Sequence, residues 1–205
     1  MKYFFSGLTV IISCCAFGQN GYYFLPNGDT IYCEIKKVFP RVVQVKTEKK
    51  RIEKFEANEI KGFTKNGIFF ISKKILNQKK NQFIFLPDNK EDGKYLYSDP
   101  TLDKISGRGI TFYELTEFGG VSQYGRRSTI TFYIENDSLG LTKIPYMSAI
   151  GSSVEKTDVI NALYNYLKND EATGKKLNVN ESWKTFNYKG IKKLITDFLG
   201  KDFLE

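Results

Sequence analysis

The sequence predicts an α+β fold: an antiparallel β meander or roll, in two β sections, followed by two C-terminal amphipathic helices. Two kinds of periodicity lead to this prediction. Apolar and polar residues alternate through much of residues 28–63 and again in residues 128–135, as in half-buried strands. From residue 153 onward, apolar residues instead recur every three or four positions, which is the spacing of one helix face.

The first β section begins at the turn signal Asn27-Gly28, because both residue types tolerate a positive φ. After this turn, Ile31, Cys33 and Ile35 alternate with polar residues, which predicts a strand with one buried face. Two further short strands, separated by a charged turn, complete the meander by Phe63.

Three short stretches give this meander a recurrent pattern: Gly28-Asp29-Thr30, Ile35-Lys36 and Glu59-Ile60-Lys61-Gly62-Phe63. The pattern resembles a family of uncharacterised proteins secreted by Gram-negative bacteria, and the resemblance covers residues 21–70 well. It implies the same layout of signal peptide, β meander, second β section and short terminal helices. The family has no assigned activity, so the resemblance implies no catalytic residue.

The second half of the chain carries further strand and turn signals. They predict strands at residues 68–72, 83–86, 94–98, 110–115, 128–135 and 139–144. Residues 99–109 are predicted as a loop, and the glycine-rich residues 118–127 as a long hairpin connection.

Two helical stripes follow, and the apolar face of the sheet is the expected partner of both. The first stripe consists of Val159, Ile160, Leu163, Tyr164 and Leu167. The second consists of Ile191, Leu194, Ile195, Phe198 and Leu199, and Gly200 is expected to end its helix.

We therefore divide the chain into four parts. Residues 1–18 are predicted to be a signal peptide, and residues 19–86 the N-terminal β section. Residues 87–150 form the second β section, and residues 151–205 a helical section packed on the sheet.

The first residues predict export, to the periplasm or beyond the cell. Lys2 precedes an apolar run that is too short to span a bilayer, and cleavage is expected between Gly18 and Gln19. The alternative is a membrane-anchored lipoprotein lipidated at Cys14. Cleavage after Gly18 would leave Cys33 as the single cysteine, and we expect it to be a buried, inert thiol. No transmembrane span is predicted in the mature chain.

Positive charge is concentrated in residues 36–80, which carry 14 Lys and Arg against 4 Glu. Such a segment suits an anionic envelope lipid or glycan, or another envelope protein, and the exported address argues against nucleic acid. The alternative is a solvated sheet face whose lysines protect strand edges from aggregation. The candidate contacts to an anionic partner are Lys46, Lys49, Lys50, Arg51, Lys73 and Lys74.

The chain has no histidine, which excludes Ser-His-Asp and Cys-His catalysis and histidine-bound metals. We predict no catalytic residue, cofactor or metal. The expected function is a non-enzymatic envelope or secreted interaction module with a basic face at residues 36–80. The alternative is a carboxylate-dependent hydrolase acting on envelope glycans, for which Glu114 and Glu117 would be the acid pair.

Overall fold

The computed structural model describes residues 21–47, 50–78, 80–89, 91–98, 100–122, 125–144, 156–167 and 188–200. These residues form a mostly β structure with one large sheet of 12 strands and two C-terminal helices. The strands are β1 (Gly21–Phe24), β2 (Thr30–Val38), β3 (Val42–Lys46), β4 (Ile52–Glu56), β5 (Gly62–Lys65), β6 (Ile68–Ile75), β7 (Gln82–Pro87), β8 (Gly93–Leu96), β9 (Thr101–Gly107), β10 (Ile110–Ser122), β11 (Gly125–Asn136) and β12 (Gly140–Ile144). The helices are α1 (Lys156–Leu167) and α3 (Tyr188–Leu199).

The sheet is largely antiparallel, and its strands follow the order β4-β3-β2-β1-β5-β6-β12-β11-β10-β9-β8, with β7 paired to β6 outside this path. The parallel exception is the junction of β6 with β12, where Ile75 pairs with Leu141. Asn77 extends this junction, because its side-chain amide donates to the carbonyl of Lys143 and accepts from the Lys143 amide. The two β sections are therefore joined within one sheet.

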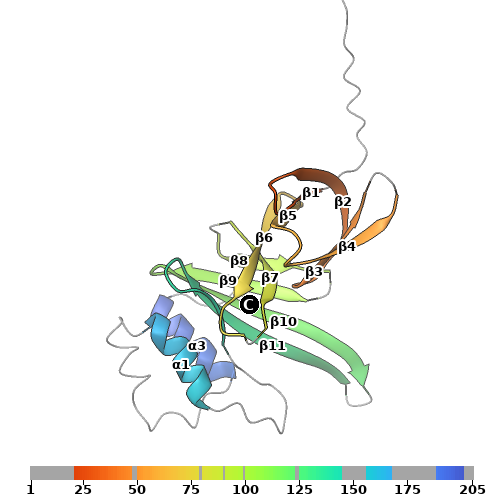
Figure 1. The fold of residues 1–205 in the computed structure, drawn as a ribbon. Helices are drawn as coiled ribbons and strands as arrows, with labels where there is room; N and C mark the ends of the chain where they lie inside the picture. The colour runs from red at the N-terminus through yellow and green to blue at the C-terminus, as the bar shows by residue number, and fades with distance from the viewer. Residues whose placement is uncertain are drawn as a thin grey trace, which may run out of the picture.

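One hydrophobic core serves both sections. The N-terminal strands lie over one face of the long hairpin β10–β11 (Figure 1). Tyr23, Cys33 and Phe63 from the first section belong to the same buried cluster as Tyr113 and Tyr133 from the second. The inward position predicted for Cys33 is confirmed, since 1% of this residue is exposed.

The two helices cover the opposite face of the second section, away from the N-terminal strands (Figure 1). Phe112, Phe132 and Ile134 from the strands pack in a second cluster with Leu163 of α1 and Ile195 of α3. The packing of the second helical stripe on the sheet is thus confirmed, as is that of Leu163, Tyr164 and Leu167 of the first, whereas the side chains of Val159 and Ile160 lie outside the described part of the chain. Gly200 follows α3 with a φ of 65°, as expected of a residue that ends a helix.

Asn66 and Gly67 form the two-residue turn between β5 and β6, with φ values of 52° and 78°. Positive φ at both central residues is the geometry of the turn that best matches the twist of paired strands.

The loop predicted for residues 99–109 is wrong, because β9 (Thr101–Gly107) occupies most of it. This strand shows no simple alternation because both of its faces are covered. Leu102 belongs to the core shared with the N-terminal strands, whereas Ile105 belongs to the core under the helices. Arg108 and Gly109 then form the turn into β10, both with positive φ.

The long connection predicted for residues 118–127 is also wrong. Strand β10 continues to Ser122 and β11 starts at Gly125, with the pairs Val121–Arg126 and Ser122–Gly125. The glycines instead accompany a shift in register between Phe118 and Val121. A β-bulge at such a point strengthens the local twist without ending the strand.

Candidate functional site

The predicted contacts to an anionic partner do not form one patch. Lys46 lies on β3 opposite Glu34, whereas Lys50 and Arg51 are exposed between β3 and β4. Lys74 is exposed on the distant strand β6. Lys49 lies outside the described residues, as do Cys14, Gly18 and Gln19.

Lys73 does not belong to a basic surface. Its ammonium group lies 2.6 Å from a carboxylate oxygen of Glu135 on β11, and both side chains are mostly buried. The charge of Lys73 is thus directed into the molecule and partly neutralised there. Charge counting along the sequence could not distinguish this lysine from exposed Lys74.

The outer face of the N-terminal strands carries a row of aromatic rings, here called the aromatic ridge: Tyr22, Phe24, Tyr32 and Phe69. The ring centroids of Tyr22 and Phe24 lie 5.1 Å apart, those of Tyr22 and Tyr32 5.9 Å, and those of Phe24 and Phe69 5.4 Å. Tyr32 is 62% exposed. Because Tyr23 lies in the core, its neighbours Tyr22 and Phe24 point to the other face of the sheet.

Two small residues underlie the ridge. A Cβ atom added to Gly62 would lie 3.0 Å from the ring of Phe69, so the glycine lets this ring lie close over strand β5. Thr64 is paired with Tyr22 on one side and Phe69 on the other. Its hydroxyl oxygen is buried and has no hydrogen-bond partner among the described residues.

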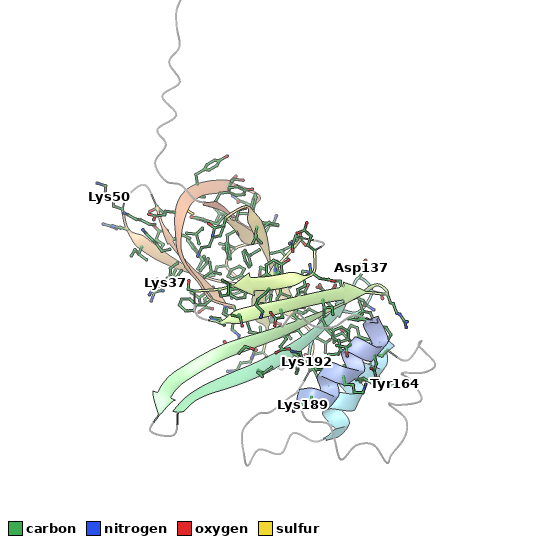
Figure 2. The ribbon with its side chains drawn as sticks, turned by 180° about the vertical axis from the view of Figure 1, so that it is seen from behind. Lys37, Lys50, Asp137, Tyr164, Lys189 and Lys192 are labelled. Carbon is green, nitrogen blue, oxygen red and sulfur yellow. The ribbon has the colours of Figure 1, made fainter. Side chains whose placement is uncertain are left out.

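Positive charge borders the ridge on the side of β2, β3 and β4. Glu34 follows Tyr32 on the same face, and its carboxylate is bonded to the ammonium of Lys36 at 2.5 Å. This hydrogen bond, with the charges of Lys36 and Lys46, lowers the pKa of Glu34. Lys37 on β2 and Lys50, between β3 and β4, both lie far from the helices (Figure 2). The ridge therefore adjoins a surface with an excess of cations.

A polar cavity of about 440 Å³ lies elsewhere, between the chain after β7 and the strands β9, β10 and β11. It is lined by Lys73, Pro87, Asp88, Asn89, Lys104, Ser106, Gly109, Thr111, Tyr113, Glu135, Asn136 and Asp137. The strand register places several of these residues side by side. Lys104 on β9 is paired with Tyr113 on β10. Thr111 lies two residues before Tyr113, on the same face of β10, and is paired with Glu135 on β11. No local sequence motif predicts this cavity, because its lining residues come from β6, from the end of β7 and the chain after it, and from β9, β10 and β11.

Hydrogen bonds connect the lining of the polar cavity. Besides Lys73, the phenol of Tyr113 donates to Glu135, at 2.9 Å. The ammonium of Lys104 donates to the backbone carbonyl of Asn89. The side chain of Asn89 accepts a hydrogen bond of 2.8 Å from the phenol of Tyr95.

Burial changes the titration of two groups in this cavity. It lowers the pKa of Lys104, and the nearby charge of Lys73 lowers it further, against the opposing effects of Asp88, Asp92 and Glu135. Burial also raises the pKa of Tyr113, and the carboxylate of Glu135 adds to this effect. Tyr113 therefore keeps its proton, while Lys104 loses its proton more readily than an exposed lysine.

The structure does not bring the acid pair Glu114 and Glu117 together. Residues three apart on a strand point to opposite faces. Glu114 lies under α3, where Lys192 is 3.0 Å from its carboxylate, whereas Glu117 is exposed and lines a hollow with Arg41. Figure 2 shows Lys192 where α3 meets the strands. Glu114 and Glu117 therefore do not form an acid pair of the kind that glycoside hydrolysis needs.

Glu114 instead has an acidic neighbour that sequence reasoning missed. Asp103 is its direct partner on β9, and it faces the helices. Burial raises the pKa of Asp103, an effect that Glu114 reinforces and that Lys94 and Lys192 oppose. Neither carboxylate lines the polar cavity or the hollow beside Arg41.

Comparisons of the chain with protein-family models, curated proteins and solved structures found no match. Export and the family resemblance of residues 21–70 therefore stay predictions. Within the described part of the chain, no group of three potential metal-ligating His, Cys, Asp or Glu residues is present. No described helix has the length and apolar character needed to span a membrane.

Proposed function

We propose that this protein is an exported, non-enzymatic interaction module that binds an anionic envelope glycan through the aromatic ridge and the adjoining lysines. The aromatic ridge is the observation that supports this proposal. Its four rings lie in edge or near-edge contact on the outer face of the N-terminal strands. Tyr32, at the β2 end of the ridge, is 62% exposed. Exposed apolar patches on a protein surface often mark binding sites, and this row of aromatic side chains lies beside cations.

The chemistry of a charged polysaccharide matches both parts of this surface. Aromatic rings can pack against the C–H faces of sugar rings, and a tyrosine also offers a hydroxyl for hydrogen bonding. Lys46 lies one strand beyond β2, opposite Glu34, where its ammonium can pair with a carboxylate or phosphate on the glycan. Glu34 is already paired with Lys36, so it opposes an anion less than a lone carboxylate would.

A glycan fits this surface better than an anionic membrane does. Tyr22, Phe24 and Phe69 are only partly exposed and lie along the sheet, so they form a contact platform and not a protruding apolar wedge. Attachment to a bilayer interface depends on burying apolar area to a depth of about 5–10 Å. We therefore assign the ridge to a sugar chain.

The test is retention of the full chain on alginate, with uncharged dextran and anionic phospholipid vesicles as alternative surfaces. Binding to alginate is expected to weaken steeply with added salt, because exposed charges are screened. Tyr32→Ala should weaken binding about threefold to tenfold, in line with the value of one aromatic contact. Lys46→Glu should weaken it about tenfold.

Two matched variants act as controls. Leu96→Ala removes an exposed apolar side chain from β8, and Lys74→Glu reverses a charge on β6. Both should bind alginate nearly as the unchanged protein does. Absence of retention at low salt, or equal losses in test and control variants, would overturn the proposal. Binding to vesicles but not to alginate would also overturn it.

A further inference from the structure

Lys104 is a buried lysine that faces the polar cavity and has no part in the proposed glycan surface. It lies in the middle of β9, is paired with Tyr113 on β10, and is 7% exposed. Lysine is among the residues that are almost never fully buried unless they are paired. The hydrogen bond that the structure gives its ammonium goes to a neutral acceptor, the carbonyl of Asn89.

The surroundings of Lys104 favour its neutral amine. Burial is the main cause of its lowered pKa, and the second cation, Lys73, acts in the same direction. A desolvated lysine next to another cationic group is the arrangement that activates an amine as a nucleophile. The acids Asp88, Asp92 and Glu135 oppose the shift without cancelling it.

The cavity also supplies room and proton-transfer groups. Its volume of about 440 Å³ lies in the range of small-molecule sites. Tyr113 and Lys73 both donate to Glu135, so a chain of exchangeable protons lines the wall next to the amine. Ser106 and Thr111, whose hydroxyls lie 3.1 Å apart, offer hydrogen bonds to a polar ligand.

We propose that the polar cavity is a covalent binding site in which the amine of Lys104 forms an imine with a small, neutral hydroxyaldehyde. The hydroxyl and amide groups of the lining suit a hydroxylated compound. The charge of the lining disfavours an anionic keto acid, because three carboxylates, Asp88, Glu135 and Asp137, line the cavity against two lysines.

The reaction needs no oxidant or reductant. The nitrogen lone pair of Lys104 attacks the aldehyde carbon and a C–N bond forms. The carbonyl oxygen takes up a proton while the nitrogen gives one up, which yields a carbinolamine. The hydroxyl group then takes up a second proton and leaves as water when the C–O bond breaks, and the nitrogen lone pair forms the C=N bond. Loss of the remaining N–H proton gives the neutral imine, so the two protons that oxygen gains equal the two that nitrogen loses. The ammonium of Lys73 lines the same cavity and can donate a proton, and Glu135, which accepts its hydrogen bond, can take up a proton.

The experiment traps this imine by reduction. The full chain is incubated near neutral pH with glyceraldehyde and cyanoborohydride, and modified lysines are located by peptide mass spectrometry. Lys74, an exposed lysine on the neighbouring β6, is the internal control. We expect Lys104 to react faster than Lys74, because burial and the charge of Lys73 lower the pKa of Lys104 and favour its neutral amine.

Two further measurements test the proposal. Pyruvate in place of glyceraldehyde should label Lys104 more slowly. Tyr32→Ala, on the remote aromatic ridge, should leave labelling unchanged, which separates this inference from the proposed function. Labelling of Lys104 no faster than Lys74, or a faster reaction with pyruvate, would overturn the proposal.

Discussion

The ammonium of Lys73 and the carboxylate of Glu135 lie 2.6 Å apart and connect β6 of the first β section to β11 of the second. Only 24% and 17% of their side chains are exposed, so solvent screens this ion pair less than a surface pair. The phenol of Tyr113 donates to the same carboxylate. Glu135 is thus the common acceptor of two partly or fully buried donors.

Replacing Glu135 by Ala should destabilise the protein by about 1–3 kcal/mol, because it leaves Lys73 and Tyr113 without their acceptor. Urea unfolding followed by circular dichroism measures this loss. Asp137→Ala is the matched control, since Asp137 lines the same cavity but is exposed. Equal stability of the two variants would show that the pair adds nothing to folding.

Tyr97→Phe should cost about 1–2 kcal/mol of stability. The phenol of Tyr97 is buried and donates to the carbonyl of Phe85 at 2.5 Å, so the variant loses this bond and gains none with water. Tyr32→Phe makes the same chemical change at an exposed position and should alter stability little. Thermal unfolding of the two variants, scanned side by side, distinguishes these outcomes.

Gly62→Ala should destabilise the N-terminal strands and displace the aromatic ridge. An added Cβ would lie 2.3 Å from the carbonyl oxygen of Phe70 and 3.0 Å from the ring of Phe69. At Gly93, another strand glycine, the nearest atoms belong to Tyr95 at 3.5 Å, an ordinary contact. We expect Gly62→Ala to cost about 1–3 kcal/mol, as overpacking does, and Gly93→Ala to be nearly neutral in the same urea assay. A neutral Gly62→Ala would contradict the close contact at β5.

Cys33 should make stability fall in alkaline solution. Burial raises the pKa of its thiol from 9.0 to about 11, so between these values the folded protein holds a proton that the unfolded chain has lost. The thiol's contribution is therefore complete below pH 9 and is lost as the pH rises toward 11, by about 2–3 kcal/mol in total.

Urea unfolding across this alkaline range, for the unchanged protein and for Cys33→Ala, measures the effect. The variant creates a small cavity and should be less stable at neutral pH, but its stability should decline less with pH. Tyrosines of the unfolded chain also lose protons in this range, whereas burial raises the pKa of Tyr97, Tyr113 and Tyr133 in the folded protein. This effect is common to both proteins. Parallel declines would show that the thiol is not protected by folding.

Local patterns predicted much of the fold. In strands with one buried face, such as the strand that contains Cys33, apolar and polar residues alternate in the sequence. Strand β9 escaped prediction because Leu102 and Ile105 face different cores, so its apolar residues fill both faces. Alternation disappears when both faces of a strand are buried.

The candidate site was less accessible to sequence reasoning, because it depends on pairing between distant strands. In the sequence, Lys73 is one of many cations in a basic segment. The structure shows that it lies beside Glu135, which is 62 residues away in the chain. Glu114 and Glu117 are close in sequence but lie on opposite faces. Asp103 becomes the neighbour of Glu114 only through the register of β9 and β10.

The junction of β6 with β12 has a consequence for the order in which the protein folds. Most neighbouring strands are joined by short turns, whereas Asn77 and Lys143 at this junction are 66 residues apart. Closing so long a loop costs entropy before any contact repays it, so local hairpins should form first and this junction late in folding. The polar cavity around Lys104 would then be assembled in the last steps of folding. A nascent or truncated chain that lacks this junction would contain the aromatic ridge but not the complete polar cavity around the Lys104 amine.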